Sequence, residues 1–266
     1  LAHLFVFELN LIPATNCHLL LAGEPVDDVV TAHLQQLRRA GAKIGSADRS
    51  RILLTMREVQ GTARESEDIL VCGFSSHGFE DRADPYIMPS DGFRALLAQT
   101  AVPLKTIESM MQDSRAGHRL LLVDACQERI SAKNVQAAGL GTPATDAFVE
   151  ALKTPTGQAK LASCSPGEFS FEHGSLGGVG HGVFTHYVLE GLRGGAKADA
   201  KNIVRLGDVA DYVAVNVSAW TTDNKRPRQT PFLESPIATR KLPLATKADD
   251  VKSLIAALQA QTPSRE

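Results

Sequence analysis

Two short apolar runs stand out along the chain, ILVCGF at residues 69–74 and LLLV at 120–123. An apolar run of this length is typical of a strand buried on both faces of a sheet. The segment QAKLASCS at 158–165, which mixes polar and apolar residues, predicts a third strand, and NCHLLL at 16–21 predicts a short fourth one.

Helical spacing of apolar residues fills most of the sequence between these runs. The first helix is expected to open at Pro25 and end at Gly41. Its apolar stripe comprises Val26, Val29, Val30, Leu34 and Leu37. Further helices are predicted at residues 1–10, from a cap at Ser46 or Asp48 to about 60, and at 104–114, 145–153, 183–192, 204–220 and 245–261.

Polar segments separate these elements. Residues 75–92 and 127–143 are expected to be loops, as is the Gly-rich segment 167–182. Apolar strands that alternate with helices predict an α/β fold, in which a mostly parallel central sheet is covered by helices on both faces. No internal repeat or low-complexity tract interrupts this pattern.

Composition narrows the classes of function. The 266 residues carry a net charge of −2, so neither a nucleic acid nor a membrane surface is expected as a partner. No segment approaches the roughly 18 apolar residues that span a bilayer. The four cysteines show no CxxC spacing, which favours a reducing, cytoplasmic location over a disulfide framework.

Two of the predicted strands run directly into reactive side chains. The first continues into Ser75, Ser76, His77 and Gly78, and the second into Asp124-Ala125-Cys126. The carboxyl ends of parallel strands meet at one edge of a sheet, where ligands commonly bind. If these strands are neighbours, an imidazole and a thiol lie together, which is the minimum for nucleophilic catalysis.

Other combinations of the same residue types are open at this point. Cys164 has His173, His181 and His186 near it in the sequence. However, Cys164 falls within a strand pattern and His186 within a helical one. Zinc would need more ligands at recognisable spacing. The segment GSLGGVGHG lacks the GxxxxGK[ST] pattern of a phosphate loop, which argues against a flavodoxin-like nucleotide-binding domain.

The strand-end motifs resemble those of the caspase-like cysteine peptidases, the group of caspases, metacaspases and paracaspases. FSSHG precedes VDAC, and His77 lies 126 − 77 = 49 residues before Cys126, close to the caspase spacing of about 50. YIMPSDG, LASCSPGEFSFE and GHGVFTHYVLEGL resemble further family segments. The match covers about residues 12–244. It implies a caspase-like three-layer α/β/α sandwich and peptide-bond hydrolysis through a thioester.

The resemblance also implies individual roles. His77 is the base and Cys126 the nucleophile, and the N–H groups of Gly78 and Cys126 form the oxyanion hole. Caspases carry Gln two positions before the cysteine, whereas metacaspases and paracaspases carry Asp and cleave after Arg or Lys. Asp124 therefore predicts protein or peptide substrates with Arg or Lys at the cleavage site, and Ser75 lines the same pocket. The alternative for Asp124 is to cap a helix or brace a loop.

Some features depart from the family pattern or stay open. Cys126 is followed by Gln-Glu instead of His-Ser-Gly, which indicates a bacterial-type caspase domain. Residues 1–244 are interpreted as this domain, with its first strand missing, and 245–266 as a tail or linker helix. A non-catalytic caspase-like interaction module is the alternative function.

Acidic residues raise two further points. No cofactor or metal is expected: Ca2+ activation occurs in some metacaspases, but Asp81, Asp84 and Asp91 lack EF-hand spacing. Glu168 and Glu172 lie in the Gly-rich segment and are candidates to line the substrate groove.

Overall fold

The computed structural model describes most of the chain. Two of the predicted elements, the helix at 145–153 and most of the helix at 245–261, lie outside the described residues, as does the loop at 127–143 beyond residue 129. No helix in the described part is long and apolar enough to cross a bilayer. The described residues are 1–25, 27–64, 68–81, 84–129, 157–165, 168, 170–174, 176, 181–199 and 203–246, with only the backbone described at 80, 81, 84, 126–129, 181 and 246.

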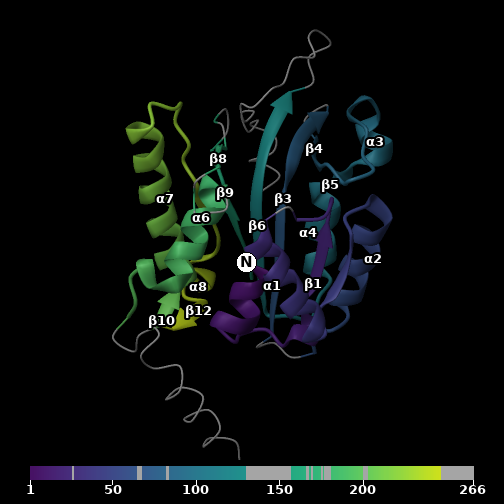
Figure 1. Ribbon diagram of the computed structural model, residues 1–266, viewed down its shortest axis with the longest axis horizontal. Coiled ribbons are helices and arrows are strands. Elements are labelled where there is room, and N and C mark those ends of the chain that lie inside the picture. Colours follow the sequence, from purple (N-terminus) through teal and green to yellow (C-terminus); the bar gives the residue numbers. More distant parts are fainter. Residues whose placement is uncertain are drawn as a thin grey trace, which may run out of the picture.

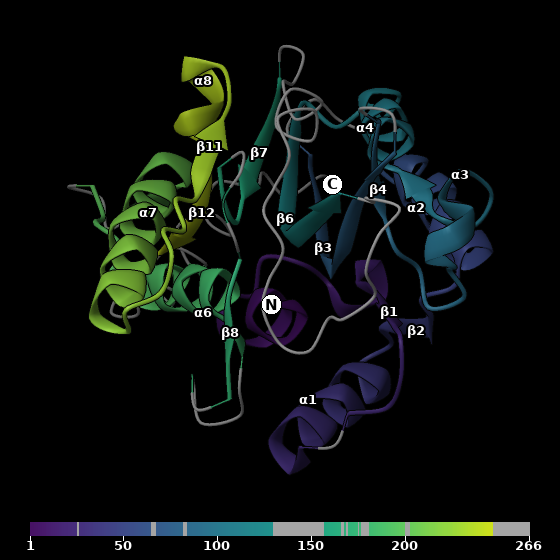
Figure 2. The ribbon, with the colours of Figure 1, turned by 90° about the horizontal axis from the view of Figure 1, so that it is seen from above.

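A six-stranded sheet with the order β11-β7-β6-β3-β4-β5 forms the centre of the molecule (Figures 1 and 2). The strands predicted at 69–74, 120–123 and 158–165 are parts of β3, β6 and β7, and β6 pairs in parallel with β3 on one side and with β7 on the other. The other three strands join the sheet antiparallel. The strands are β3 (Ile69–Asp81), β4 (Asp84–Ile87), β5 (Val102–Pro103), β6 (His118–Arg129), β7 (Gln158–Ala162) and β11 (Phe232–Glu234).

Three small two-stranded sheets surround the central one. The strand predicted at residues 16–21 is β1, which pairs in parallel with a strand that the sequence pattern did not indicate. The other two sheets are antiparallel, and one lies within the predicted Gly-rich loop 167–182. The pairs are β1 (His18–Leu21) with β2 (Lys43–Ser46), β8 (Glu172–His173) with β9 (His181–Gly182), and β10 (Ile203–Arg205) with β12 (Pro243–Thr246).

Helices cover both faces of the central sheet, which confirms the predicted three-layer α/β sandwich (Figure 1). Successive residues of β6 point alternately into two hydrophobic cores, one on each face of the sheet. Leu120 and Leu122 pack in the core formed with α6 and α7. Leu121 and Val123 pack in the core formed with α2 and α4. Each fully buried leucine contributes about 1.5–3 kcal/mol by leaving water. These helices are α2 (Arg49–Gln60), α4 (Leu104–Gln112), α6 (Val183–Glu190) and α7 (Leu206–Asp223).

Shorter helical segments complete the fold, and the helix expected near the start of the chain is present as a five-residue π-helix. The cap of α2 is Asp48, one of the two predicted candidates, which accepts the Arg51 N–H at 2.8 Å. The remaining segments are η1 (Leu4–Glu8), η2 (Ala14–Asn16), α1 (Asp28–Arg39), η3 (Arg94–Leu96), α3 (Leu97–Thr100), η5 (Gly191–Gly195) and α8 (Ile237–Arg240).

The predicted apolar stripe of α1 is wrong in its first half. Asp27 caps this helix by accepting the N–H of Val29 at 2.9 Å. Leu34 and Leu37 are buried as expected, but Val29 is 53% exposed. Figure 2 shows α1 at the rim of the molecule, away from the central sheet. A helix in that position packs against the rest of the molecule along only part of its length. The spacing of apolar residues therefore predicted a longer buried face than α1 has.

The predicted loop at residues 75–92 is also wrong in part. β3 continues through this segment to Asp81 and pairs antiparallel with β4. Its pairing with β6 extends to Glu80 opposite Arg129, so the ladder carries a polar sequence that apolar patterning cannot identify as strand. This extension brings the predicted site residues into the regular sheet.

Candidate active site

The pairing of β3 with β6 places His77 directly opposite Cys126. Opposed residues on neighbouring parallel strands have Cα atoms about 5 Å apart and side chains on the same face of the sheet. For Cys126 the structure describes the backbone, and its thiol lies outside the described side chains. The two predicted catalytic residues therefore occupy neighbouring positions within the ladder of two adjacent parallel strands, toward the carboxyl ends of both.

The two predicted pocket residues form the next pair on the same face. Ser75 lies opposite Asp124 in the same register. Since side chains alternate along a strand, Asp124 lies on the face of β6 that also carries Leu122, which is the face covered by α6 and α7. Ser75 and His77 are exposed, and Asp124 is partly buried. Ser75 and His77 on β3 are thus each paired with one residue of β6, Asp124 and Cys126 respectively.

The backbone carbonyl of His77 accepts a hydrogen bond from the residue that follows β4, while the His77 side chain is exposed. The Met88 N–H donates to the His77 carbonyl at 3.0 Å, and the Ser76 hydroxyl donates to the Met88 carbonyl at 2.7 Å. The N–H and C=O of one strand residue point toward the same neighbouring strand, and those of the next residue point toward the neighbouring strand on the other side. The N–H of Gly78 therefore points toward β6. Its role in an oxyanion hole stays a prediction.

The other three cysteines are unsuited to attack a substrate. Cys17, Cys72 and Cys164 are all buried. Burial raises the pKa of Cys72 to about 12 and also raises that of Cys17, which disfavours the reactive thiolate. Cys164 follows the end of β7 and is only 2% exposed. These thiols behave as small core residues, and Cys126 remains the candidate nucleophile.

The histidines that were candidates to pair with Cys164 have aromatic neighbours. The ring of His173 in β8 lies 5.8 Å from that of Trp220, edge to face. The ring of His186, within α6, lies 5.0 Å from that of Tyr187. For His181 only the backbone is described, opposite His173 in the β8–β9 pair. Because Cys164 is buried, none of these rings makes it an accessible nucleophile.

Asp124 caps the helix α6, the structural role that the sequence left open beside the pocket role. Thr185, the third residue of α6, donates its hydroxyl to Oδ2 and its N–H to the same carboxylate. Ser170 donates its hydroxyl to Oδ1 at 3.1 Å. Gly182, which precedes the helix, has no side chain to cap it. Asp124 supplies the missing cap from the central sheet.

The electrostatics of Asp124 are dominated by desolvation. Burial raises the pKa of Asp124, and the negative charge of Glu172 raises it further. The hydrogen bonds from Thr185 and Ser170 act in the opposite direction. Among the described residues, no Lys or Arg forms an ion pair with this carboxylate. Asp124 is thus an acid held by neutral donors.

A buried amide contacts one of the donors of Asp124, the hydroxyl of Ser170. Gln229 is 0% exposed, and its Nε2 donates to the Ser163 carbonyl at 2.9 Å and to the Ser170 hydroxyl at 3.2 Å. Its Oε1 accepts the Phe171 N–H at 3.0 Å. Sequence reasoning missed Ser170, Thr185 and Gln229 as members of the site. Thr185 lies in GHGVFTHYVLEGL, a segment that resembles the family, but no sequence motif or periodicity pointed to Gln229.

The remaining acidic candidates have distinct surroundings. Glu168 accepts the Thr230 hydroxyl at 2.9 Å and so braces the loop before β11, whereas Glu172 is exposed. Asp91 accepts the Arg49 N–H at 2.8 Å at the start of α2. The side chains of Asp81 and Asp84 lie outside the described set. In the described part of the chain no group of three or more His, Cys, Asp or Glu residues is arranged to hold a metal.

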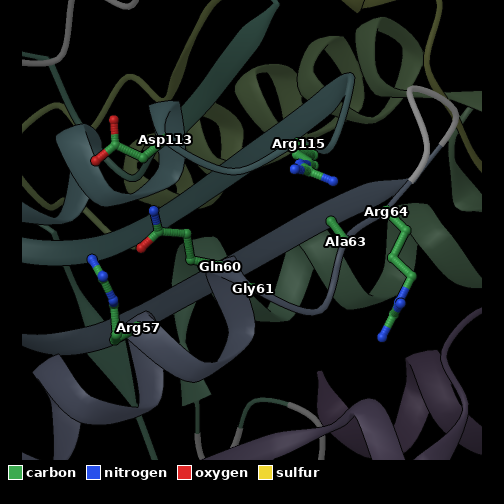
Figure 3. Close-up of a pocket in the computed structure, with 7 residues that line it drawn as sticks. All are labelled: Arg57, Gln60, Gly61, Ala63, Arg64, Asp113 and Arg115. Carbon is green, nitrogen blue, oxygen red and sulfur yellow. The ribbon is translucent and has the colours of Figure 1, made fainter.

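A cavity of about 410 Å³ lies near the amino-terminal ends of β3 and β6, at the opposite end of these strands from the predicted dyad. Its walls come from the ends of α2 and α4, just before β3 and β6 begin (Figure 3). From Ile69 to His77 the strand rises by about 25 Å, so this cavity is remote from the predicted dyad. It is lined by Arg57, Gln60, Gly61, Ala63, Arg64, Asp113 and Arg115.

Comparisons with known proteins agree with this architecture. Residues 11–243 match the sequence profile of the caspase domain. The crystal structure of caspase-1 from Spodoptera frugiperda is similar with a TM-score of 0.50 and 14% identity, over 87% of this chain and 90% of that one. A Geobacter sulfurreducens protein matches with a TM-score of 0.47 and 13% identity, over 78% of this chain and 84% of that one. No curated protein sequence matched significantly.

Proposed function

We propose that this chain, which belongs to the caspase domain family of cysteine peptidases, is an endopeptidase that cleaves after Arg or Lys with His77 and Cys126 as its catalytic dyad. The observation that carries the proposal is the register of β3 and β6, which sets His77 opposite Cys126 and Ser75 opposite Asp124. One face of two adjacent strands then offers a nucleophile, a base and an acidic pocket residue.

The chemistry follows from these positions. The Cys126 sulfur attacks the scissile carbonyl carbon while His77 takes the thiol proton. The carbonyl oxygen becomes an oxyanion, for which the N–H groups of Gly78 and Cys126 are the proposed donors. The tetrahedral intermediate collapses to a thioester as His77 returns the proton to the leaving amine. Water, deprotonated by His77, then hydrolyses the thioester and regenerates the thiol.

The preference for a basic residue is proposed from the placement of Asp124. It precedes Cys126 by two residues on the same face, about 7 Å along the strand. A long cationic side chain next to the scissile bond can span that distance. A carboxylate that has no cation of its own among the described residues would bind such a side chain by a charge-assisted hydrogen bond.

Fluorogenic peptides that differ only in the residue before the cut test this proposal. Arg, Lys, Asp and Ala substrates are assayed with the unmodified chain, Cys126→Ala, His77→Ala and the matched control Cys164→Ala, with and without Ca2+. We expect turnover of the Arg and Lys peptides that is lost in Cys126→Ala and His77→Ala and kept in Cys164→Ala. Equal activity of Cys126→Ala would exclude the dyad.

Two other results have specific meanings. Turnover after Asp instead of Arg or Lys would retain the peptidase but remove Asp124 as its selector. Absence of any turnover by folded protein, together with slow labelling of Cys126 by a thiol-reactive peptide, would favour the non-catalytic interaction module.

A further inference from the structure

Gln229 is a buried polar side chain that the catalytic steps above do not use. It lies in the segment between α7 and β11, and the two ends of its amide face different backbone groups. Oε1 accepts the Phe171 N–H at 3.0 Å, and Nε2 donates to the Ser163 carbonyl at 2.9 Å. A backbone N–H can only donate and a backbone carbonyl can only accept. These two partners therefore fix which end of the amide carries the hydrogens.

The fixed orientation of this amide sets the direction of the hydrogen bonds that follow from it. Nε2 of Gln229 also donates to the Ser170 hydroxyl oxygen, 3.2 Å away. An amide NH₂ group cannot accept, so the Ser170 hydroxyl must direct its own hydrogen to another group. It donates to Oδ1 of Asp124 at 3.1 Å. Gln229, Ser170 and Asp124 thus form a directed chain in which each side chain donates to the next.

A chain in this direction favours the ionised form of Asp124. A carboxylate only accepts hydrogen bonds, whereas a protonated carboxyl group must also donate one. Burial raises the pKa of Asp124, and the hydrogen bonds from Thr185 and Ser170 oppose that rise. Without Gln229, the Ser170 hydroxyl could turn and accept a hydrogen from the protonated carboxyl. That arrangement would favour the neutral acid.

Other titratable groups lie on the elements beside Asp124. After burial, the negative charge of Glu172 is a further cause of the raised pKa of Asp124. A test of the directed chain must separate Asp124 from these neighbours. They are His77 of β3, Cys126 of β6, Glu172 and His173 of β8, His181 of β9 and His186 of α6.

We infer that Gln229 is a positioning residue of the primary pocket: it directs the Ser170 hydroxyl toward Asp124 and so keeps this carboxyl group ionised at the pH at which a substrate cation binds. This inference rests on the proposed peptidase function. Gln229 does not touch the substrate and acts through Ser170. Loss of either residue should therefore raise the pH at which the preference for Arg appears. Loss of both together should add little, because the two residues act in series.

The pH dependence of the preference for a charged substrate tests this role. kcat/KM is measured from acid to neutral pH for peptides with Arg or citrulline, the neutral isostere of Arg, before the cut. The ratio of the two values reports the charge of the pocket and cancels the titration of the dyad, which both peptides share. In Ser170→Ala and in Gln229→Met the midpoint of this ratio should rise by about one pH unit. The double variant should show no larger rise.

Ser218→Ala is the matched control, because the Ser218 hydroxyl donates to the backbone carbonyl of Gln229 at 3.3 Å and not to its amide. Its midpoint should equal that of the unmodified chain. An unchanged midpoint in folded Gln229→Met would overturn the inference. Additive shifts in the double variant would also overturn it, since Gln229 would then act on Asp124 without Ser170. A lower kcat with the same midpoint would likewise overturn it and assign Gln229 a structural role.

An NMR titration of the unmodified chain needs neither a variant of Gln229 nor hydrolysis. The side-chain NH₂ signals of Gln229 are followed by ¹H–¹⁵N correlation spectra as the pH is lowered. One of the two signals should shift as Asp124 takes up its proton. This shift should vanish in Ser170→Ala and in Asp124→Asn, which separates Asp124 from the neighbouring titratable groups. Signals that do not respond to pH, or that respond equally in Asp124→Asn, would overturn the inference.

The two measurements also separate this inference from the proposed function. If the unmodified chain cleaves neither peptide, the proposed function fails, and the NMR titration still decides whether Gln229 directs Ser170 toward Asp124. If the Arg peptide is cleaved but the midpoint is the same in every variant, the proposed function stands and the positioning role of Gln229 fails.

Discussion

Two carboxylates on opposite faces of the central sheet are treated differently by the fold. Glu108 of α4 is 9% exposed and pairs with Lys160 of β7, which is 0% exposed. Asp124 of β6 lies on the other face and is held by the hydroxyls of Thr185 and Ser170. Burial raises the pKa of both acids and lowers that of Lys160 to about 8.

The comparison shows that the fold gives one buried acid a cation and gives the other, the proposed pocket residue Asp124, only neutral donors among the described residues. Glu108 has a cation supplied by the fold itself, so its charge is compensated within the core. Asp124 has hydrogen-bond donors but no cation among the described residues, so an incoming cation can still gain from its charge. Burial and a raised pKa alone do not distinguish the two acids, whereas the identity of their partners does.

The largest expected effect breaks the compensated pair. Lys160→Met leaves Glu108 buried without its cation, which should lower the free energy of unfolding by about 3–5 kcal/mol. The double variant Lys160→Met/Glu108→Leu removes both charges and should recover most of that loss. Urea denaturation measures both changes. A double variant as unstable as the single one would mean that Lys160 stabilises the fold through other contacts.

A smaller effect is expected for Asp124→Asn, and mainly on activity. The amide can still accept from Thr185, and its NH₂ can donate to the Ser170 hydroxyl, so stability should change by less than about 1 kcal/mol. Loss of the charge should lower kcat/KM for an Arg peptide by about 10- to 100-fold. Assays with Arg and citrulline peptides measure the selectivity. A large loss of stability with unchanged selectivity would assign Asp124 to helix capping alone.

The smallest effect concerns pH. Burial raises the pKa of Asp124 in the folded chain above its ordinary value of 3.8, so the folded state binds its proton more tightly than the unfolded state does. Its contribution to stability is therefore fully present below 3.8 and is lost as the pH rises through the folded pKa. The stability difference between the unmodified chain and Asp124→Asn should fall over that range in urea titrations. A difference that rises with pH would contradict the raised pKa.

Much of the fold was predictable because it depends on local patterns. The predicted strands at 69–74, 120–123 and 158–165 correspond to three central strands, since strands buried on both faces of a sheet are rich in consecutive apolar residues. The helix α2 begins after one of the two predicted caps, Asp48. Where tertiary contacts decide, the pattern failed: β3 extends through a polar segment because β4 and β6 pair with it on either side.

The candidate site divides in the same way. The sequence led to the positions of His77, Cys126, Ser75 and Asp124 because reactive side chains followed strand patterns and resembled known motifs; the roles of these residues stay predictions. The contacts of Asp124 were not predictable, because Thr185 lies 61 residues away in the sequence and Ser170 lies 46 residues away. No local pattern encodes a helix cap supplied from another element.

By itself, the sequence determined the alternation of strands and helices and the delivery of an imidazole, a thiol and a carboxylate to strand ends. Only the tertiary structure decided that β3 and β6 are neighbours in the register that opposes His77 to Cys126, and that Ser170 links Gln229 to Asp124. The physical reason is that periodicity follows from local backbone geometry, whereas register depends on how distant segments pack around two shared cores.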